Sequence, residues 1–173
     1  QLWQLHFDNV TLQTIGLQLG ADVPFFVSPH PSAYAQGIGE QLSPIELPAR
    51  ELLLIKPNVH ADTREVYQHP LLVRDHVPLD MGASALSEQL KILNARTTLS
   101  NDMQAAAFAI APKIKRVHDT LQHLVPHTYV RMSGSGATVF ACPQNSAERD
   151  ALNQWLKTCP EDWQHRWCHT LSE

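Results

Sequence analysis

Apolar positions in the first third of the chain form one helical repeat followed by short apolar runs. Positions 12, 15, 17 and 19 predict a helix that starts after an N-cap at Thr11 and stops at a left-handed Gly20. The short, β-prone run 23–27 predicts a strand, with residues 32–36 as its partner. A continuous apolar run at 52–55 indicates a covered strand, which Pro57 ends.

The remainder of the chain predicts helices that alternate with strands. We expect helical segments at 64–68, 83–93, 102–124 and 146–156, strands at 128–132, 138–142 and 166–170, and a glycine-rich turn at 133–136. Pro112 divides the third segment into two helices, because proline lacks an N–H and clashes with the preceding turn. This order predicts an α+β fold, with an antiparallel sheet and helices packed on one face.

Composition and charge exclude several classes of protein. Apolar residues make up 43% of the 173 positions and charged residues 17%, as in a globular domain. The formal net charge of -4 provides no basic surface for nucleic acid or for an anionic membrane. Three cysteines without CxxC spacing predict neither a disulfide framework nor a zinc site, so we expect a reducing, cytoplasmic setting. The first residues read as the end of a helix entered midway, so we expect the chain to start inside a larger protein.

One acidic residue, Asp22, stands between the predicted helix stop and an apolar run, in LGADVPFF at 19–26. A carboxylate is costly to bury without a partner, so an acid in this setting indicates either a structural partner or a chemical task. Taken alone, the residue is explained more simply as a turn cap, or as an acceptor of backbone N–H groups.

A second candidate is the small-residue turn Gly134, Ser135 and Gly136, in RMSGSGATVF at 131–140. The backbone N–H groups of such a turn can converge on an anion, since no side chain blocks close approach. The spacing also suits an ordinary hairpin turn with glycines at positive φ. It matches neither the Walker pattern nor the dinucleotide fingerprint.

Two other polar groups are explained without chemistry. Ser100 and Asn101 are suitable N-caps for the helix that follows, and Asp102 suits its positive end. The histidines at 118, 123, 127, 165 and 169 lack a metal-binding spacing, so we expect no metal site.

Three segments are distinctive when taken together. They are LGADVPFFV with the following AYAQGIGE at 33–40, SNDM at 100–103, and RMSGSGATVF at 131–140. In sequence, order and separation they resemble the C-terminal portion of the 4-diphosphocytidyl-2-C-methyl-D-erythritol kinase family, a branch of the GHMP kinases. The resemblance implies transfer of a phosphoryl group from ATP, with Mg²⁺, to a hydroxyl of a cytidine diphosphate-linked methylerythritol. That reaction belongs to non-mevalonate isoprenoid precursor biosynthesis.

The resemblance also implies roles for particular residues. Asp22 matches the family's catalytic aspartate, which orients the substrate hydroxyl and accepts its proton. The turn at 134–136 matches a motif that shapes the phosphate pocket, and Tyr67 matches an aromatic used against the cytosine ring. Residues 49–173 are then expected to be the GHMP kinase C-terminal domain, and residues 1–48 a remnant of the N-terminal, ATP-binding domain.

The chain departs from the family pattern in two ways. Pro29 stands where the family has glycine, so we expect the local turn to differ. The family's glycine-rich phosphate loop, and the lysine that partners its aspartate, lie upstream of the matching segments. We therefore expect this chain to be inactive alone and to need the N-terminal half of the same protein as its partner.

Two alternatives stay open at this point. One is a non-catalytic binding module with the same fold, and the other is a GHMP kinase for a sugar, homoserine or a mevalonate-type substrate. If a partner half is absent, Trp3, Leu5 and Phe7 would expose apolar surface, so we expect self-association.

Overall fold

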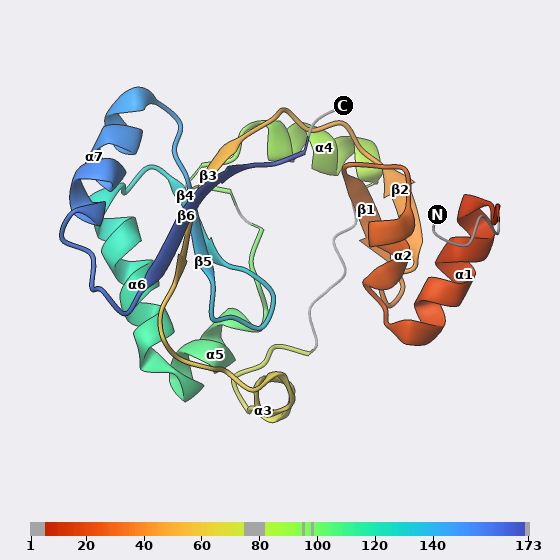
Figure 1. The fold of residues 1–173 in the computed structure, drawn as a ribbon, viewed down its shortest axis with the longest axis horizontal. Helices are drawn as coiled ribbons and strands as arrows, with labels where there is room; N and C mark the ends of the chain where they lie inside the picture. The colour runs from red at the N-terminus through yellow and green to blue at the C-terminus, as the bar shows by residue number, and fades with distance from the viewer. Residues whose placement is uncertain (1–5, 75–81, 95, 98, 172–173) are drawn as a thin grey trace. The chain divides into compact units, whose positions relative to one another are not determined.

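The computed structural model describes residues 6–74, 82–94, 96–97 and 99–171, which form two compact units (Figure 1). The first unit contains the described residues up to Pro48, residues 82–91 and Leu171, and the second contains the others. Trp3 and Leu5 lie outside the described residues. The assignment of residues 1–48 and 49–173 to two kinase domains stays a prediction.

The first unit begins with helix α1 (Asn9–Leu19). Its N-cap is Asp8, whose Oδ1 accepts a hydrogen bond from the Thr11 N–H at 2.7 Å, so the predicted cap at Thr11 is wrong by three residues. Gly20 ends the helix as predicted, but its φ of 171° is extended rather than left-handed.

The segment predicted as a strand at 23–27 is helix α2 (Val23–Val27). Pro24 explains this difference, because a proline near the start of a helix already has the helical φ, whereas in a strand it removes a ladder hydrogen bond. Strand β1 (Ala33–Gln36) therefore pairs with β2 (Gln41–Pro44), in antiparallel register from Ala33 opposite Pro44 to Gln36 opposite Gln41. Helix α4 (Ala83–Lys91) completes the unit, and its Ser87 Oγ donates to the Glu46 carbonyl at 2.8 Å.

A four-stranded antiparallel sheet forms the second unit, in the order β4-β5-β3-β6. Its strands are β3 (Glu51–Lys56), β4 (Tyr129–Met132), β5 (Val139–Cys142) and β6 (Gln164–His169). All four strands are predicted from sequence, and β6 begins two residues before its predicted start. Central strand β3 buries Leu53 and Ile55 completely, in agreement with its continuous apolar run.

Four helices accompany this sheet. They are α3 (Thr63–Gln68), α5 (Gln104–Ile110), α6 (Pro112–Leu124) and α7 (Ser146–Leu156). Pro112 starts α6 and separates it from α5, as predicted. Figure 1 shows α6 and α7 on the same side of the sheet, and their buried Ile114, Leu121 and Leu152 join the core beneath it. The α+β class, with helices packed on one face of an antiparallel sheet, is confirmed.

Candidate functional site

Asp22, the predicted catalytic residue, lies in the turn that joins α1 to α2. The turn is tight because the Gly20 N–H donates to the Gly16 carbonyl at 3.1 Å and the Val23 N–H donates to the Gly20 carbonyl at 3.2 Å. The Asp22 side chain is exposed. Although Asp22 occupies the N-cap position of α2, its carboxylate makes no capping hydrogen bond within the described part of the chain. The simpler explanation of this residue, a turn cap, is therefore not what the structure shows.

Two glycines fix this turn by letting other segments come close. A Cβ at Gly16 would lie 2.9 Å from Val23 Cγ1, so the absent side chain lets α2 pack against α1. Gly39 has a φ of 122°, and a Cβ there would lie 3.1 Å from the Ala21 carbonyl oxygen. The β1–β2 hairpin thus reaches the residue before Asp22. Both contacts restrain the backbone on either side of Asp22.

The glycine-rich turn closes the hairpin between β4 and β5 in the second unit. The Ser133 N–H donates to the Thr138 carbonyl at 2.9 Å, and the Gly136 N–H donates to the Ser133 carbonyl at 3.0 Å. Gly134 has a φ of 54° and Gly136 a φ of 99°, as expected of glycines in such a turn. No described residue accepts a hydrogen bond from the N–H groups of Gly134 and Ser135. A Cβ at Gly134 would meet no atom within 4 Å, so this side of the turn is open and suits an anion.

Side chains that precede and begin α5 hold the turn from outside. Asn101 Nδ2 donates to the Met132 carbonyl at 2.9 Å and to the Gly134 carbonyl at 2.7 Å. Its Oδ1 accepts from the Met103 N–H at 2.9 Å, a local turn bond that lies ahead of α5. The N-cap of α5 is Met103 and has no side-chain cap, so the predicted N-cap at Ser100 or Asn101 is wrong, because the helix begins later than expected. Gln104 Oε1 accepts from the Met132 N–H at 3.0 Å. Capping alone therefore does not account for Asn101.

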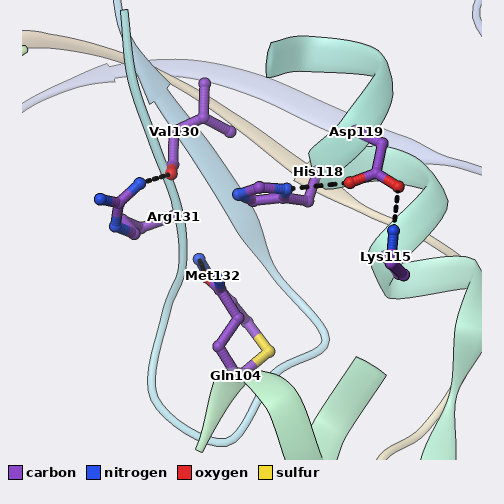
Figure 2. A network of polar contacts seen from close by, with 7 residues as sticks. All are labelled: Gln104, Lys115, His118, Asp119, Val130, Arg131 and Met132. Atoms are coloured by element: carbon purple, nitrogen blue, oxygen red, sulfur yellow. Dashed lines mark hydrogen bonds and ion pairs between the residues drawn. The ribbon is translucent and has the colours of Figure 1, made fainter. Parts of the chain in front are cut away.

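Arg131 fastens the segment before α5 to strand β4. Its guanidinium donates to the carbonyls of Leu99 and Thr97, both at 3.3 Å, and to that of Val130 at 2.7 Å, the bond drawn in Figure 2. The same guanidinium lies 4.5 Å from the centre of the Tyr129 ring. Burial raises the pKa of Tyr129, and the nearby Arg131 opposes part of that rise. Arg131 therefore has a structural role: its guanidinium holds the segment that leads to Asn101 against strand β4.

A polar cluster on α6 also appears in Figure 2. Asp119 pairs with Lys115 one turn earlier and with the neighbouring His118 at 3.3 Å. The hydrogen bond from Lys115 lowers the pKa of the Asp119 carboxyl. About half of the surface of each of the Lys115 and Asp119 side chains is exposed, so this pair belongs to a solvated helix face.

Tyr67, the predicted base-stacking residue, lies on α3 in the same unit as the turn and is 56% exposed. The Thr63 Oγ1, on the first residue of α3, lies 2.9 Å from Ser135 Oγ, so this helix starts beside the turn. The N-cap of α3 is Asp62, whose Oδ1 accepts from two backbone N–H groups at 2.8 and 3.1 Å.

The structure therefore brings part of the predicted site together. The turn residues contact Asn101 and Thr63, which the sequence does not identify as site residues, and Tyr67 lies one turn further along α3. Asp22 belongs to the first unit. Pro29 directly follows Ser28, the C-cap of α2, which is a favourable place for proline.

The described residues contain no group of three or more histidine, cysteine, aspartate or glutamate side chains that could hold a metal ion, so we assign no metal ligand. No helix in that part of the chain is long and apolar enough to cross a bilayer.

Comparison with characterised sequences finds related kinases. The chain is 39% identical over 165 residues to the 4-diphosphocytidyl-2-C-methyl-D-erythritol kinase of Polynucleobacter asymbioticus. This alignment covers 94% of this chain and 52% of the relative. It is 37% identical over 176 residues to the kinase of that name from Burkholderia multivorans, covering 100% of this chain and 57% of the relative. The chain thus spans about half the length of the curated relatives it matches. No family model matches the chain.

Solved structures point in the same direction. A crystal structure of a 4-(cytidine 5′-diphospho)-2C-methyl-D-erythritol kinase matches 96% of this chain and 59% of its own length, with a TM-score of 0.67 and 27% identity. A homoserine kinase from Cytophaga hutchinsonii matches 76% of this chain and 45% of its own length, with a TM-score of 0.50 and 14% identity, which shows a shared fold alone. The resemblance to these kinases that the sequence predicts is confirmed.

Proposed function

We propose that this chain is the C-terminal part of a 4-diphosphocytidyl-2-C-methyl-D-erythritol kinase, and that the whole kinase phosphorylates a hydroxyl of its cytidine diphosphate-linked substrate with ATP. The observation that carries the proposal is the match to such kinases over 94–100% of this chain. An exposed Asp22 without a capping role supports it, because a carboxylate with no structural task is free for chemistry.

In this proposal Asp22 acts as the general base. Its carboxylate orients the acceptor hydroxyl and takes its proton while the hydroxyl oxygen forms a bond to the γ-phosphorus. The bond between that phosphorus and the bridging oxygen breaks, and ADP leaves with the electron pair. An exposed carboxylate on a restrained backbone suits this task, because a base must reach the hydroxyl from a defined position.

The glycine-rich turn is proposed to contact phosphate oxygens. The N–H groups of Gly134 and Ser135 are unused within the described part of the chain, and the open side of Gly134 admits close approach. ATP carries its own magnesium ion on its phosphates when bound, and no residue of this chain is assigned to that ion. Tyr67, exposed on α3, is proposed to stack on the cytosine.

The isolated chain of 173 residues is proposed to be inactive as a kinase. Phosphoryl transfer depends on holding the phosphates and neutralising their charge. This chain offers the glycine-rich turn for that purpose, whereas Lys113 and Lys115 on α6 pair with Asp162 and Asp119. We therefore expect no turnover from the chain alone and full activity only from the longer kinase that contains it.

A panel of acceptor substrates tests the function directly. The whole kinase is incubated with ATP, magnesium and, in separate reactions, the cytidine diphosphate-linked methylerythritol, homoserine, mevalonate or galactose, and ADP release is measured. We expect turnover with the first acceptor alone. Preferred turnover of homoserine, whose kinase shares this fold, would replace the substrate assignment, and no turnover of any acceptor would favour a binding module.

A further inference from the structure

We propose that Asn101 is a positioning residue, which sets the backbone of the glycine-rich turn for phosphate contact through its two side-chain N–H donors. The expected effect on kcat rests on the proposed function. The expected effect on the backbone of the turn rests on the hydrogen-bond geometry alone. It gives a role to a residue of the SNDM segment, to which the sequence alone assigns no chemical task.

The oxygen and the nitrogen of the Asn101 side-chain amide make hydrogen bonds to different parts of the chain. The Oδ1 atom accepts from the Met103 N–H at 2.9 Å, which is a local bond within three residues. The Nδ2 atom donates to the carbonyls of Met132 and Gly134, at 2.9 and 2.7 Å, which lie more than thirty positions away in the sequence. The second pair of bonds fixes the carbonyls on both sides of Ser133.

Fixing these carbonyls also fixes the N–H groups that follow them. In a trans peptide the carbonyl oxygen and the next N–H point in opposite directions, so the orientation of the Gly134 carbonyl sets that of the Ser135 N–H. Drawing this carbonyl toward Asn101 turns the Ser135 N–H away from α5. That N–H is one of the two that donate to no described residue.

Two other contacts also restrain the glycine-rich turn, and they differ from those of Asn101. Gln104 Oε1 holds the Met132 N–H at 3.0 Å, and Thr63 Oγ1 lies 2.9 Å from Ser135 Oγ. Neither contact reaches the Gly134 carbonyl. Within the described residues, Asn101 alone restrains the peptide group that leads into Ser135 from outside the turn.

The substitution Asn101→Asp separates the two roles. It keeps an oxygen that can accept from the Met103 N–H, as aspartate and asparagine both do in such local turns. It replaces both donors with an oxygen that repels the carbonyls of Met132 and Gly134. Asn145→Asp is the control, because Asn145 also accepts a local backbone hydrogen bond through its Oδ1, from the Glu148 N–H at 3.0 Å, and lies at the N-cap of α7 instead of beside the turn.

Two measurements test the proposal. In the whole kinase we expect Asn101→Asp to lower kcat by about tenfold or more, since small displacements of catalytic donors have effects of this size. The KM for the acceptor should change much less. By NMR, hydrogen exchange at the Gly136 and Met132 amides should speed up in Asn101→Asp, while the exchange of α5 amides stays as in the wild type.

The outcomes separate this inference from the proposed function. Exchange and kcat that match those of Asn145→Asp would overturn the positioning role while the kinase assignment stood. A wild-type kinase without turnover would overturn the function, and the exchange data would then decide the structural claim alone. Faster exchange along the whole of α5 in Asn101→Asp would show that the local bond to the Met103 N–H is the residue's main task and would also overturn the proposal.

Discussion

At the scale of single residues, the two glycines of the turn have unequal surroundings. A Cβ at Gly136 would lie 3.1 Å from Met132 Sδ and 3.2 Å from Ile114 Cδ1, and its φ of 99° is unfavourable for any other residue. Gly134 has a φ of 54°, inside the small left-handed region, and open space beyond it. Gly136 therefore lets the turn pack closely on the core, whereas Gly134 leaves one side of the turn open.

Alanine substitutions should reveal this difference. We predict that Gly136→Ala lowers the free energy of unfolding by about 2–3 kcal/mol, because strain adds to crowding. Gly134→Ala should cost about 1 kcal/mol, the penalty of the left-handed conformation alone. Urea unfolding followed by tryptophan fluorescence measures both. Equal costs would contradict the different packing described for the two glycines.

Residue types made some of the site predictable and concealed the rest. Asp22 and the glycines at 134 and 136 stand out because their segments together resemble one kinase family, whereas each of them alone has an ordinary structural explanation. Asn101 is hidden because one asparagine satisfies the local rule for an N-cap, and its partners at Met132 and Gly134 lie far away in sequence. Only tertiary structure reveals a donor that serves such distant carbonyls.

At the scale of elements, most helices and strands could be predicted, but helix α2 and strand β2 could not. Helices α3, α4, α5, α6 and α7, and strands β3 to β6, were each expected near their observed bounds. The run at 23–27 has the composition of a strand but folds as α2, because Pro24 suits the first turn of a helix and the segment packs onto Gly16 of α1. Tertiary packing outweighs β propensity for five residues such as these.

The start of α3 offers a prediction at this scale. Asp62 accepts from two backbone N–H groups of a helix only six residues long, which carries Thr63 and Tyr67. We expect Asp62→Ala to lower the free energy of unfolding by about 1 kcal/mol and to speed amide exchange in α3. Asp62→Asn keeps the acceptor and should stay within a few tenths of wild type. If both variants unfold alike, the cap is not what secures this helix.

At the scale of the whole molecule, the first unit leaves large apolar side chains uncovered. Val10 and Leu19 on α1 are 74% and 79% exposed, and Phe26 on α2 is 79% exposed. Gly16 is the buried residue of α1, so this helix has little core of its own. Surfaces of this kind are covered by another protein surface in stable proteins, and the curated relatives are about twice as long.

Self-association of the isolated chain follows from that surface. We predict that the 173-residue chain sediments as species larger than a monomer at micromolar concentration, and that Leu19→Lys with Phe26→Lys shifts it toward the monomer. Ile92→Lys is the matched control, because Ile92 is 72% exposed but belongs to the second unit. A wild-type chain that is monomeric at every concentration would contradict this account.

The central claim is that Asp22 is the base of a phosphotransfer reaction, and one measurement addresses it. Initial rates of ADP release by the whole kinase are compared for wild type, Asp22→Asn and Asp8→Asn, with circular dichroism as a check of folding. Asp8 caps α1, and asparagine preserves that bond, so its variant is the control. We predict that Asp22→Asn lowers kcat by about 10²–10⁴-fold while Asp8→Asn stays near wild type. A folded Asp22→Asn enzyme with near-normal kcat would contradict the claim.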